Sequence, residues 1–163
     1  MDETLINQIA KSIPHLTKQF LGVFPKNQYP KVNNVKLPVC FIINKDKYLE
    51  PGSHWVSVFV PKHDEIYYFD SFGIPPQTDP YIMKILKWFN KKTLEYSTVQ
   101  IQPYDSSTCG LYSIYFLYLL SLKTYSLQKC LLFFNHDCNL YLNDIKIKKL
   151  FSEIMIRNKI SIN

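Results

Sequence analysis

A chain of 163 residues can form one domain with a substantial core, and its 47% hydrophobic and 15% aromatic content excludes an intrinsically disordered protein. No apolar run reaches the roughly 18 residues that span a bilayer, and acidic residues stand near the N-terminus where a secretory signal needs lysines. We therefore expect a single soluble domain over residues 1–163 that acts inside a cell, away from membranes, with its four cysteines as free thiols.

The net charge of +6 comes almost entirely from lysine, because Arg157 is the only arginine. Lysine attracts phosphate groups as a hydrated point charge, whereas arginine is the side chain that recognises guanine through two hydrogen bonds. The composition therefore permits weak, non-specific binding to nucleic acid and argues against reading of base sequence. A generally basic surface explains the charge equally well.

The first predicted element is a helix that Asp2 caps and Pro14 ends. Its apolar positions have helical spacing: Leu5, Ile6, Ile9, Ala10 and Ile13. Residues 22–38 are rich in Pro, Asn and Lys, and we predict a loop there.

Three extended runs follow, at 38–44, 54–60 and 65–70. The middle run is apolar at both alternating sets of positions, which predicts a central strand buried on both faces. The tetrapeptide PKHD at 61–64 joins the second and third runs as a hairpin.

In the second half, Asp79-Pro80 has the chemistry of a helix start, and residues 98–102 are predicted to form a strand. Further helices are predicted over 109–122, after Ser126 and within 141–157. The last of these should direct Leu142, Ile145, Leu150, Phe151 and Ile154 inward, and Lys146, Lys148, Lys149 and Lys159 outward. We expect an α+β domain in which a mainly antiparallel central sheet packs against helices.

Three of the four glycines lie within three residues of a group suited to acyl transfer: Gly52 before His54, Gly73 after Asp70, and Gly110 after Cys109. Glycine permits sharp turns and close approach of the backbone to a ligand. Cys109 is the candidate nucleophile, because a thiol at a helix start beside an imidazolium ionises readily. A buried structural cysteine is the alternative, and Cys40 and Cys130 fit that alternative better.

His54 is the candidate base and Asp70 the acid that orients it. The turn at 61–64 lies midway between them, so the hairpin should place both side chains at the same end of adjacent strands. Gln102, seven residues before Cys109, is a candidate oxyanion donor together with the backbone N–H of the cysteine. Taken singly, each residue also has an ordinary structural interpretation, as do the other histidines, His15, His63 and His136.

Two competing chemistries have weaker support. Cys130, His136 and Cys138 are close in sequence, but their spacing matches no familiar zinc site and no fourth ligand is evident. Ser106 and Ser107 lack the G-x-S-x-G pattern of a serine hydrolase, and no glycine-rich phosphate loop occurs.

Five segments, in order and spacing, resemble the adenovirus maturation protease (adenain) family: FLGVFP (20–25), KLPVCFIIN (36–44), GSHWVSVFV (52–60), YYFDSFG (67–73) and QPYDSSTCGLYSIYFL (102–117). The resemblance implies an adenain-like fold with catalytic His54, Asp70, Gln102 and Cys109. It also implies substrate contacts at Gly52, Trp55 and Gly110. The adenoviral enzyme has Glu where Asp70 stands, a chemically equivalent choice. That enzyme also holds an activating peptide by a disulfide, whereas residues 79–101 here contain no cysteine.

We therefore expect a monomeric cysteine endopeptidase that cleaves viral, or virus-like, precursor proteins at small residues such as glycine during particle maturation, in the host nucleus or virion. No metal or small-molecule cofactor is expected. The resemblance implies stimulation by an activating peptide and by DNA, the latter through Lys146, Lys148 and Lys149. A deconjugase acting on ubiquitin-like tails and a non-catalytic interaction module remain the alternatives.

Overall fold

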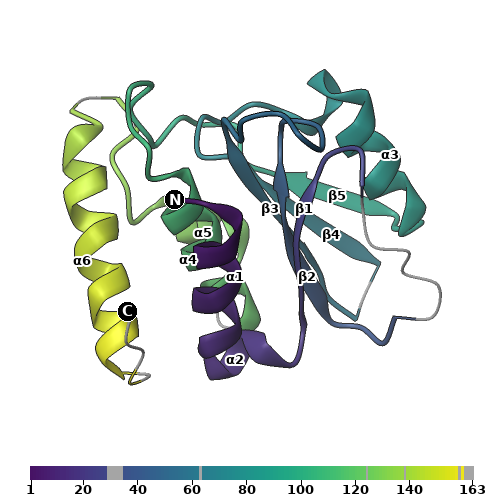
Figure 1. Ribbon diagram of the computed structural model, residues 1–163, viewed down its shortest axis with the longest axis horizontal. Helices are drawn as coiled ribbons and strands as arrows, with labels where there is room; N and C mark the ends of the chain where they lie inside the picture. The colour runs from purple at the N-terminus through teal and green to yellow at the C-terminus, as the bar shows by residue number, and fades with distance from the viewer. Residues whose placement is uncertain (29–34, 63, 124, 138, 158, 160–163) are drawn as a thin grey trace.

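The computed structural model describes residues 1–28, 35–62, 64–123, 125–137, 139–157 and 159 (Figure 1). The helices are α1 (Glu3–Ser12), α2 (Pro14–Thr17), α3 (Pro80–Trp88), α4 (Cys109–Ser121), α5 (Leu127–Leu131) and α6 (Tyr141–Arg157), with a 3-10 turn at Pro76–Thr78. The strands are β1 (Phe20–Pro25), β2 (Val39–Asn44), β3 (Trp55–Val60), β4 (Glu65–Phe69) and β5 (Thr93–Tyr96). No helix in these ranges is long and apolar enough to cross a membrane.

The five strands form one sheet in the order β1-β2-β3-β4-β5. The two inner pairings, β2 with β3 and β3 with β4, are antiparallel, and the two outer pairings are parallel. The α+β prediction is therefore confirmed, with a mixed sheet whose antiparallel part is its centre. All six residues of β3 are buried, as predicted for a central strand.

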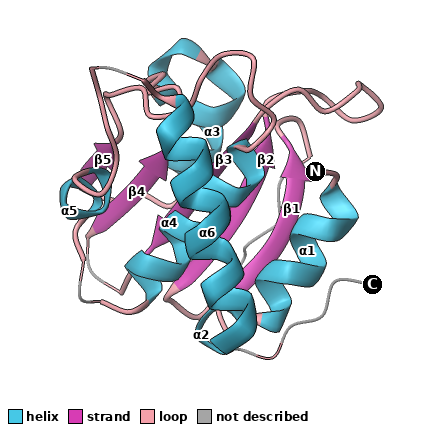
Figure 2. Ribbon diagram, turned by 90° about the vertical axis from the view of Figure 1, so that its left-hand side faces the viewer, coloured by secondary structure: helices cyan, strands magenta, loops and turns pink. Residues whose placement is uncertain are grey.

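The sheet divides the hydrophobic core in two. Helices α1, α2 and α4 cover one face, with α6 packed against the outer side of α4, and α3 covers the other face (Figures 1 and 2). Helix α4 lies against β3, and eleven of its thirteen residues are buried. A helix that is apolar on all sides is stable only inside such a core, and this burial fixes the position of its first residue, Cys109.

The predicted helix starts at Asp2, Asp79 and Ser126 are confirmed, because each side chain accepts a backbone N–H of the first turn. One loop prediction and one strand prediction are wrong in their bounds. The proposed loop at 22–38 begins inside β1, an edge strand in which Pro25 is tolerated. The strand proposed at 98–102 lies instead at Thr93–Tyr96.

Helix α6 is present as predicted, but two of its predicted inward residues face outward. Leu142 and Ile145 are 50% and 66% exposed, whereas Asn143 is 1% exposed. The buried face of α6 consists of Asn143, Ile147, Phe151, Ile154 and Met155. Asn143 fills an inner position because its amide group makes three buried or partly buried hydrogen bonds there.

Candidate active site

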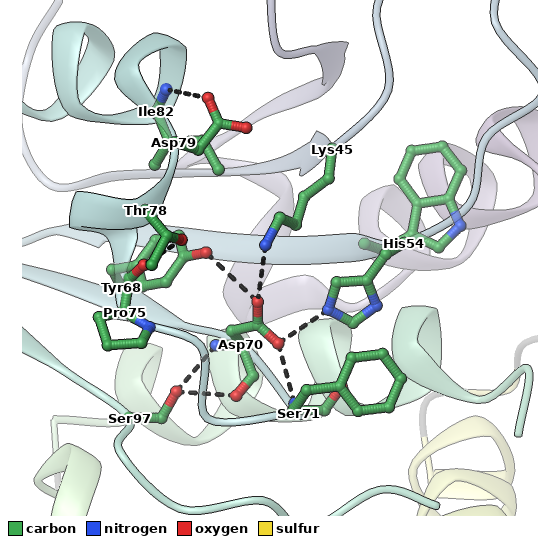
Figure 3. A network of polar contacts seen from close by, with 12 residues as sticks. Lys45, His54, Tyr68, Asp70, Ser71, Pro75, Thr78, Asp79, Ile82 and Ser97 are labelled. Carbon is green, nitrogen blue, oxygen red and sulfur yellow. Dashed lines mark hydrogen bonds and ion pairs between the residues drawn. The ribbon is translucent and has the colours of Figure 1, made fainter. Parts of the chain in front are cut away.

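The central hairpin brings His54 and Asp70 together at one end of the inner strands β3 and β4. His54 precedes β3, Asp70 follows β4, and Ser57 pairs with Phe69 in the antiparallel register. His54 Nε2 lies 2.8 Å from Asp70 Oδ1, and the Asp70 side chain is fully buried. The structure thus places the two residues as the hairpin geometry predicted (Figure 3).

Asp70 has a set of further partners that sequence reasoning missed (Figure 3). The N–H of Phe72 donates to Oδ1 at 2.8 Å, whereas the Lys45 ammonium and the Tyr68 hydroxyl lie 3.4 and 3.5 Å from Oδ2. The Ser97 hydroxyl bonds both backbone groups of Asp70. These contacts hold the carboxylate in one orientation. Lys45 directly follows β2 and lies opposite His54 in the antiparallel pairing. Its position in the sequence could therefore have indicated that it lies near the site.

The His54 ring is held by stacking on its face as well as by the hydrogen bond of Nε2 to Asp70. It stacks on the Phe72 ring with centroids 4.5 Å apart, and Phe72 in turn stacks on Tyr104. His54 Nδ1, the ring nitrogen that does not bond Asp70, is buried. The ring nitrogen that Asp70 does not engage is therefore left for the thiol and for a substrate.

Cys109 is the first residue of α4 and is 6% exposed. Ser113, one turn further along the helix, donates its hydroxyl to the carbonyl oxygen of Trp55 at 3.1 Å. This bond ties the start of α4 to the start of β3. The nucleophile candidate is consequently held beside the residue that follows His54.

The electrostatics of the pair favour a thiolate and an imidazolium. Burial opposes charge on the His54 ring, but hydrogen bonding to Asp70 and to Cys109 outweighs it and raises the pKa of His54 to about 9. Burial likewise opposes ionisation of Cys109, yet the hydrogen bond and charge of His54, with backbone contributions from Trp55 and Gly110, lower the pKa of this thiol. Each group stabilises the charged form of the other.

Gln102 is fully buried and its amide is oriented from both ends. The Ser71 hydroxyl donates to Oε1 at 2.6 Å, and Nε2 donates to the carbonyl oxygen of Ser106 at 2.8 Å. A primary amide carries two N–H donors, and the bond to Ser106 uses one of them. Ser71 is therefore a further site residue, and its position directly after Asp70 was its only signal in the sequence.

The predicted substrate-contact residues separate into two groups. Gly52 and Trp55 line an open cavity of about 610 Å³, together with Asp2, Glu3 and Glu50. Gly110 does not line this cavity itself, but a Cβ at this position would meet Met1, which does line it, and Ile6 of α1.

Gly73 has a different structural role. A Cβ there would lie 2.6 Å from the backbone carbon of Val99, and its φ is +68°. The glycine allows residues 98–102 to pass close beside the turn that follows Asp70.

The remaining cysteines and histidines do not form a site in the described residues. Burial raises the pKa of Cys40, and raises that of Cys130 to about 12. His136 bonds to the carbonyl oxygen of Leu131. Within those residues no group of three His, Cys, Asp or Glu side chains could hold a metal ion. His63 and Cys138 lie outside the described residues.

The three lysines proposed to bind DNA differ in their surroundings. Lys146 donates to the carbonyl oxygen of Phe133, and its ammonium lies 5.8 Å above the Phe134 ring. Lys148 and Lys149 are exposed on α6.

Comparison with known proteins relates the chain to a family. The family model of the adenovirus endoprotease matches residues 20–133. The protease of Fowl adenovirus A serotype 1 is 31% identical over 127 residues, which cover 71% of this chain and 61% of that protein. A protein of Acanthamoeba polyphaga mimivirus, named as a thiol protease, is 36% identical over 87 residues, 48% of this chain and 28% of that protein. The matches thus span less than two thirds of either relative.

Solved structures similar to this chain include ChlaDub1 of Chlamydia trachomatis. It aligns with a TM-score of 0.53 and 15% identity over 96% of this chain and 78% of that one. This likeness concerns the fold alone. The ASFV protease aligns with a TM-score of 0.42 and 24% identity over 61% of this chain and 40% of that one. On the match over residues 20–133, the chain belongs to the adenovirus endoprotease family.

Proposed function

We propose that the chain is a cysteine endopeptidase with Cys109 as nucleophile, His54 as acid and base, Asp70 as the acid that orients His54, and Gln102 as an oxyanion donor. One observation carries the proposal: the buried Asp70–His54 pair lies beside a thiol whose pKa is lowered by that histidine. A thiolate is the reactive form of cysteine, and here the hydrogen bond and charge of His54 favour it.

The proposed reaction begins with attack of the Cys109 thiolate on a peptide carbonyl carbon. The electron pair of the C=O bond moves to the oxygen, where the second N–H of Gln102 and the backbone N–H of Cys109 stabilise the charge. The C–N bond then breaks as the imidazolium of His54 gives its proton to the leaving amine. Neutral His54 next takes a proton from water, whose oxygen displaces Cys109 and releases the acid.

The proposed substrates are precursor polypeptides of a virus or virus-like element, cut near small residues such as glycine during particle maturation, in the host nucleus or the virion. The viral proteases among the relatives support this assignment. We also propose that DNA, bound through the exposed lysines of α6, and an activating peptide without a disulfide tether stimulate cleavage.

The test is replacement of the nucleophile. Cys109→Ala should abolish cleavage of a glycine-containing peptide while the folded chain retains its circular dichroism, because alanine is well tolerated in a first helical turn. Cys130→Ala, at a thiol whose pKa burial raises, is the matched control and should cleave at the wild-type rate when folded. Cleavage by Cys109→Ala at the wild-type rate contradicts the assignment.

Two further measurements separate the alternative functions. A low dose of iodoacetamide should alkylate Cys109 well before Cys40 and Cys130, whereas equal slow alkylation of all three indicates a non-catalytic module. Peptides with internal glycine should be cleaved in preference to ubiquitin-like conjugates. The reverse preference assigns the chain as a deconjugase.

A further inference from the structure

Helix α6 contacts the loop that joins Gln102 to Cys109, although α6 lies outside residues 20–133, the segment that matches the family model. Asn143 donates its amide to the carbonyl oxygens of Ile101 and Asn135, both at 2.8 Å. The next residue, Asp144, contacts the loop further along. The first turn of α6 is therefore bound to the backbone on which Gln102 lies.

The Asp144 carboxylate accepts three hydroxyl groups. Oδ2 accepts from Ser106 at 2.5 Å, and Oδ1 accepts from Thr108 at 2.8 Å and from Tyr112 at 3.1 Å. The hydroxyls of Ser106 and Thr108 are themselves 2.7 Å apart. Hydrogen bonds to an ionised acceptor are stronger than neutral ones. Their donors lie on both sides of Cys109, so a single carboxylate holds the approach to α4 and its first turn.

These contacts continue to Gln102 through the backbone of Ser106. Its hydroxyl is bound to Asp144, and its carbonyl oxygen accepts the Gln102 amide at 2.8 Å. At the other end of that amide, Ser71 donates to Oε1. The Gln102 amide is thus held between the residue that follows Asp70 and a loop residue that α6 holds.

The other contacts of the loop are made by exposed side chains: Tyr104 stacks on Phe72, and Asp105 accepts from the Tyr141 hydroxyl. Residues 103–108 form no helix or strand, and Tyr104 and Asp105 are exposed. A segment without ladder hydrogen bonds opens more readily than the elements it joins. Because an oxyanion donor acts only when it is already aimed at the developing charge, movement of Ser106 would release the amide from that direction.

We propose that Asp144 is a positioning residue for the reaction: by holding Ser106, it keeps the Gln102 amide aimed at the oxyanion. The inference rests on the proposed function, in which Gln102 donates to that oxygen. It extends the site beyond the segment that matches the family, to a carboxylate 35 residues after Cys109 in the chain.

The experiment compares Asp144→Ala and Asp144→Asn with the wild type on a short peptide. Asp144→Ala should lower kcat by about 10- to 100-fold and change KM by less than about 3-fold, because the lost contact matters in the transition state. Asp144→Asn should recover most of the rate, because its carbonyl oxygen can still accept a hydroxyl hydrogen and its NH2 group can donate to the oxygen of another hydroxyl. Asp105→Ala is the control: this exposed acid of the same loop bonds Tyr141 of α6, and its loss should change kcat by less than about 2-fold.

A double-mutant cycle separates positioning from simple docking of α6. If Asp144 acts through Gln102, Asp144→Ala should lower kcat by less than about 3-fold in a Gln102→Ala background. Equal fold losses in both backgrounds overturn the proposal, as does an Asp144→Ala enzyme with unchanged kcat or with a change in KM alone. If Asp144→Ala fails to fold, Ser106→Ala removes the same link without a substitution in α6 and is judged by the same criteria.

The two hypotheses fail in different ways. A wild type that neither cleaves peptides nor shows selective alkylation of Cys109 overturns the proposed function, and the positioning role with it. A wild type that does both, alongside Asp144 variants that retain its kcat, overturns the positioning role alone.

Discussion

Protonation of the His54 imidazole is the residue property on which the proposed reaction depends. Its pKa is raised to about 9 because the hydrogen bonds to Asp70 and Cys109 outweigh burial. A raised folded-state pKa means that the charged ring stabilises the fold most fully below the unfolded value of about 6.5. This contribution is lost as pH rises through about 9.

The first residue-scale prediction concerns pH. The rate constant kcat/KM on a short peptide should fall as pH rises through about 9, because His54 then loses the proton needed by the leaving amine. Asp70→Asn removes the negative charge that favours the imidazolium, so this alkaline limb should move to lower pH. Asp64→Asn, at an exposed ion pair with Lys92, is the control and should leave the profile unchanged. An alkaline limb that Asp70→Asn does not move contradicts the role of Asp70.

The second residue-scale prediction concerns Gln102. Gln102→Ala should lower kcat by roughly 10²- to 10³-fold with little change in KM, as for loss of one oxyanion donor. Ser71→Ala removes only the hydroxyl that orients the amide, so its loss should be smaller and should disappear in the Gln102→Ala background. Steady-state kinetics at a fixed pH measure both. A loss confined to KM would make Gln102 a substrate-binding residue instead.

At the scale of elements, helix α4 positions the nucleophile by its burial and by its start. The helix packs against β3, and its Ser113 bonds the Trp55 carbonyl oxygen. Cys109 therefore occupies the first turn, where unpaired backbone N–H groups and the positive end of the helix dipole favour a thiolate. An isolated helix of the same sequence would have the same dipole but no fixed relation to His54.

The prediction at this scale concerns DNA and helix α6. Reversal of the exposed pair, Lys148→Glu with Lys149→Glu, should weaken binding to two unrelated duplexes alike and flatten the dependence of affinity on salt. Lys84→Glu with Lys87→Glu on α3, across the sheet from α6, makes the same charge change and should have the smaller effect. Fluorescence anisotropy at low and near-physiological salt measures this. Tight binding to only one duplex, or equal effects of the two pairs, contradicts the assignment.

Lys146 is left out of this reversal because its ammonium already bonds the Phe133 carbonyl oxygen and lies over the Phe134 ring. The apolar side chains Leu142, Ile145 and Ile156 are exposed on the same helix. The outer surface of α6 is thus partly apolar as well as basic.

At the scale of the whole molecule, the site is assembled from segments far apart in sequence. Lys45, His54 and Asp70 lie together at one end of strands β2, β3 and β4, and helix α4 places Cys109 beside them. Helix α6 binds the loop between Gln102 and Cys109 through Asp144, which accepts the Ser106 hydroxyl. The hairpin of β3 and β4 places the carboxylate beside the imidazole, and the packing of α4 on β3 adds the thiol.

The sequence by itself determined the features that depend on local chemistry. Helix caps at Asp2, Asp79 and Ser126 have a characteristic residue pattern, and the hairpin at 61–64 fixes which residues of its two strands lie side by side. The proximity of His54 and Asp70 followed from that count alone. The positions of Cys109 and Gln102 beside them came from resemblance to a family, since no local pattern relates residue 54 to residue 109.

The tertiary structure decided what depends on contacts between distant segments. The strand at Phe20–Pro25 forms because β2 pairs with it, although its own glycine and proline favour a loop. The orientation of α6 follows from Asn143 and Asp144, which bond loop atoms more than thirty residues away in the chain and thereby turn Leu142 and Ile145 outward. Periodicity records which helix positions are apolar. It does not record a buried amide or carboxylate whose partners are supplied by another part of the fold.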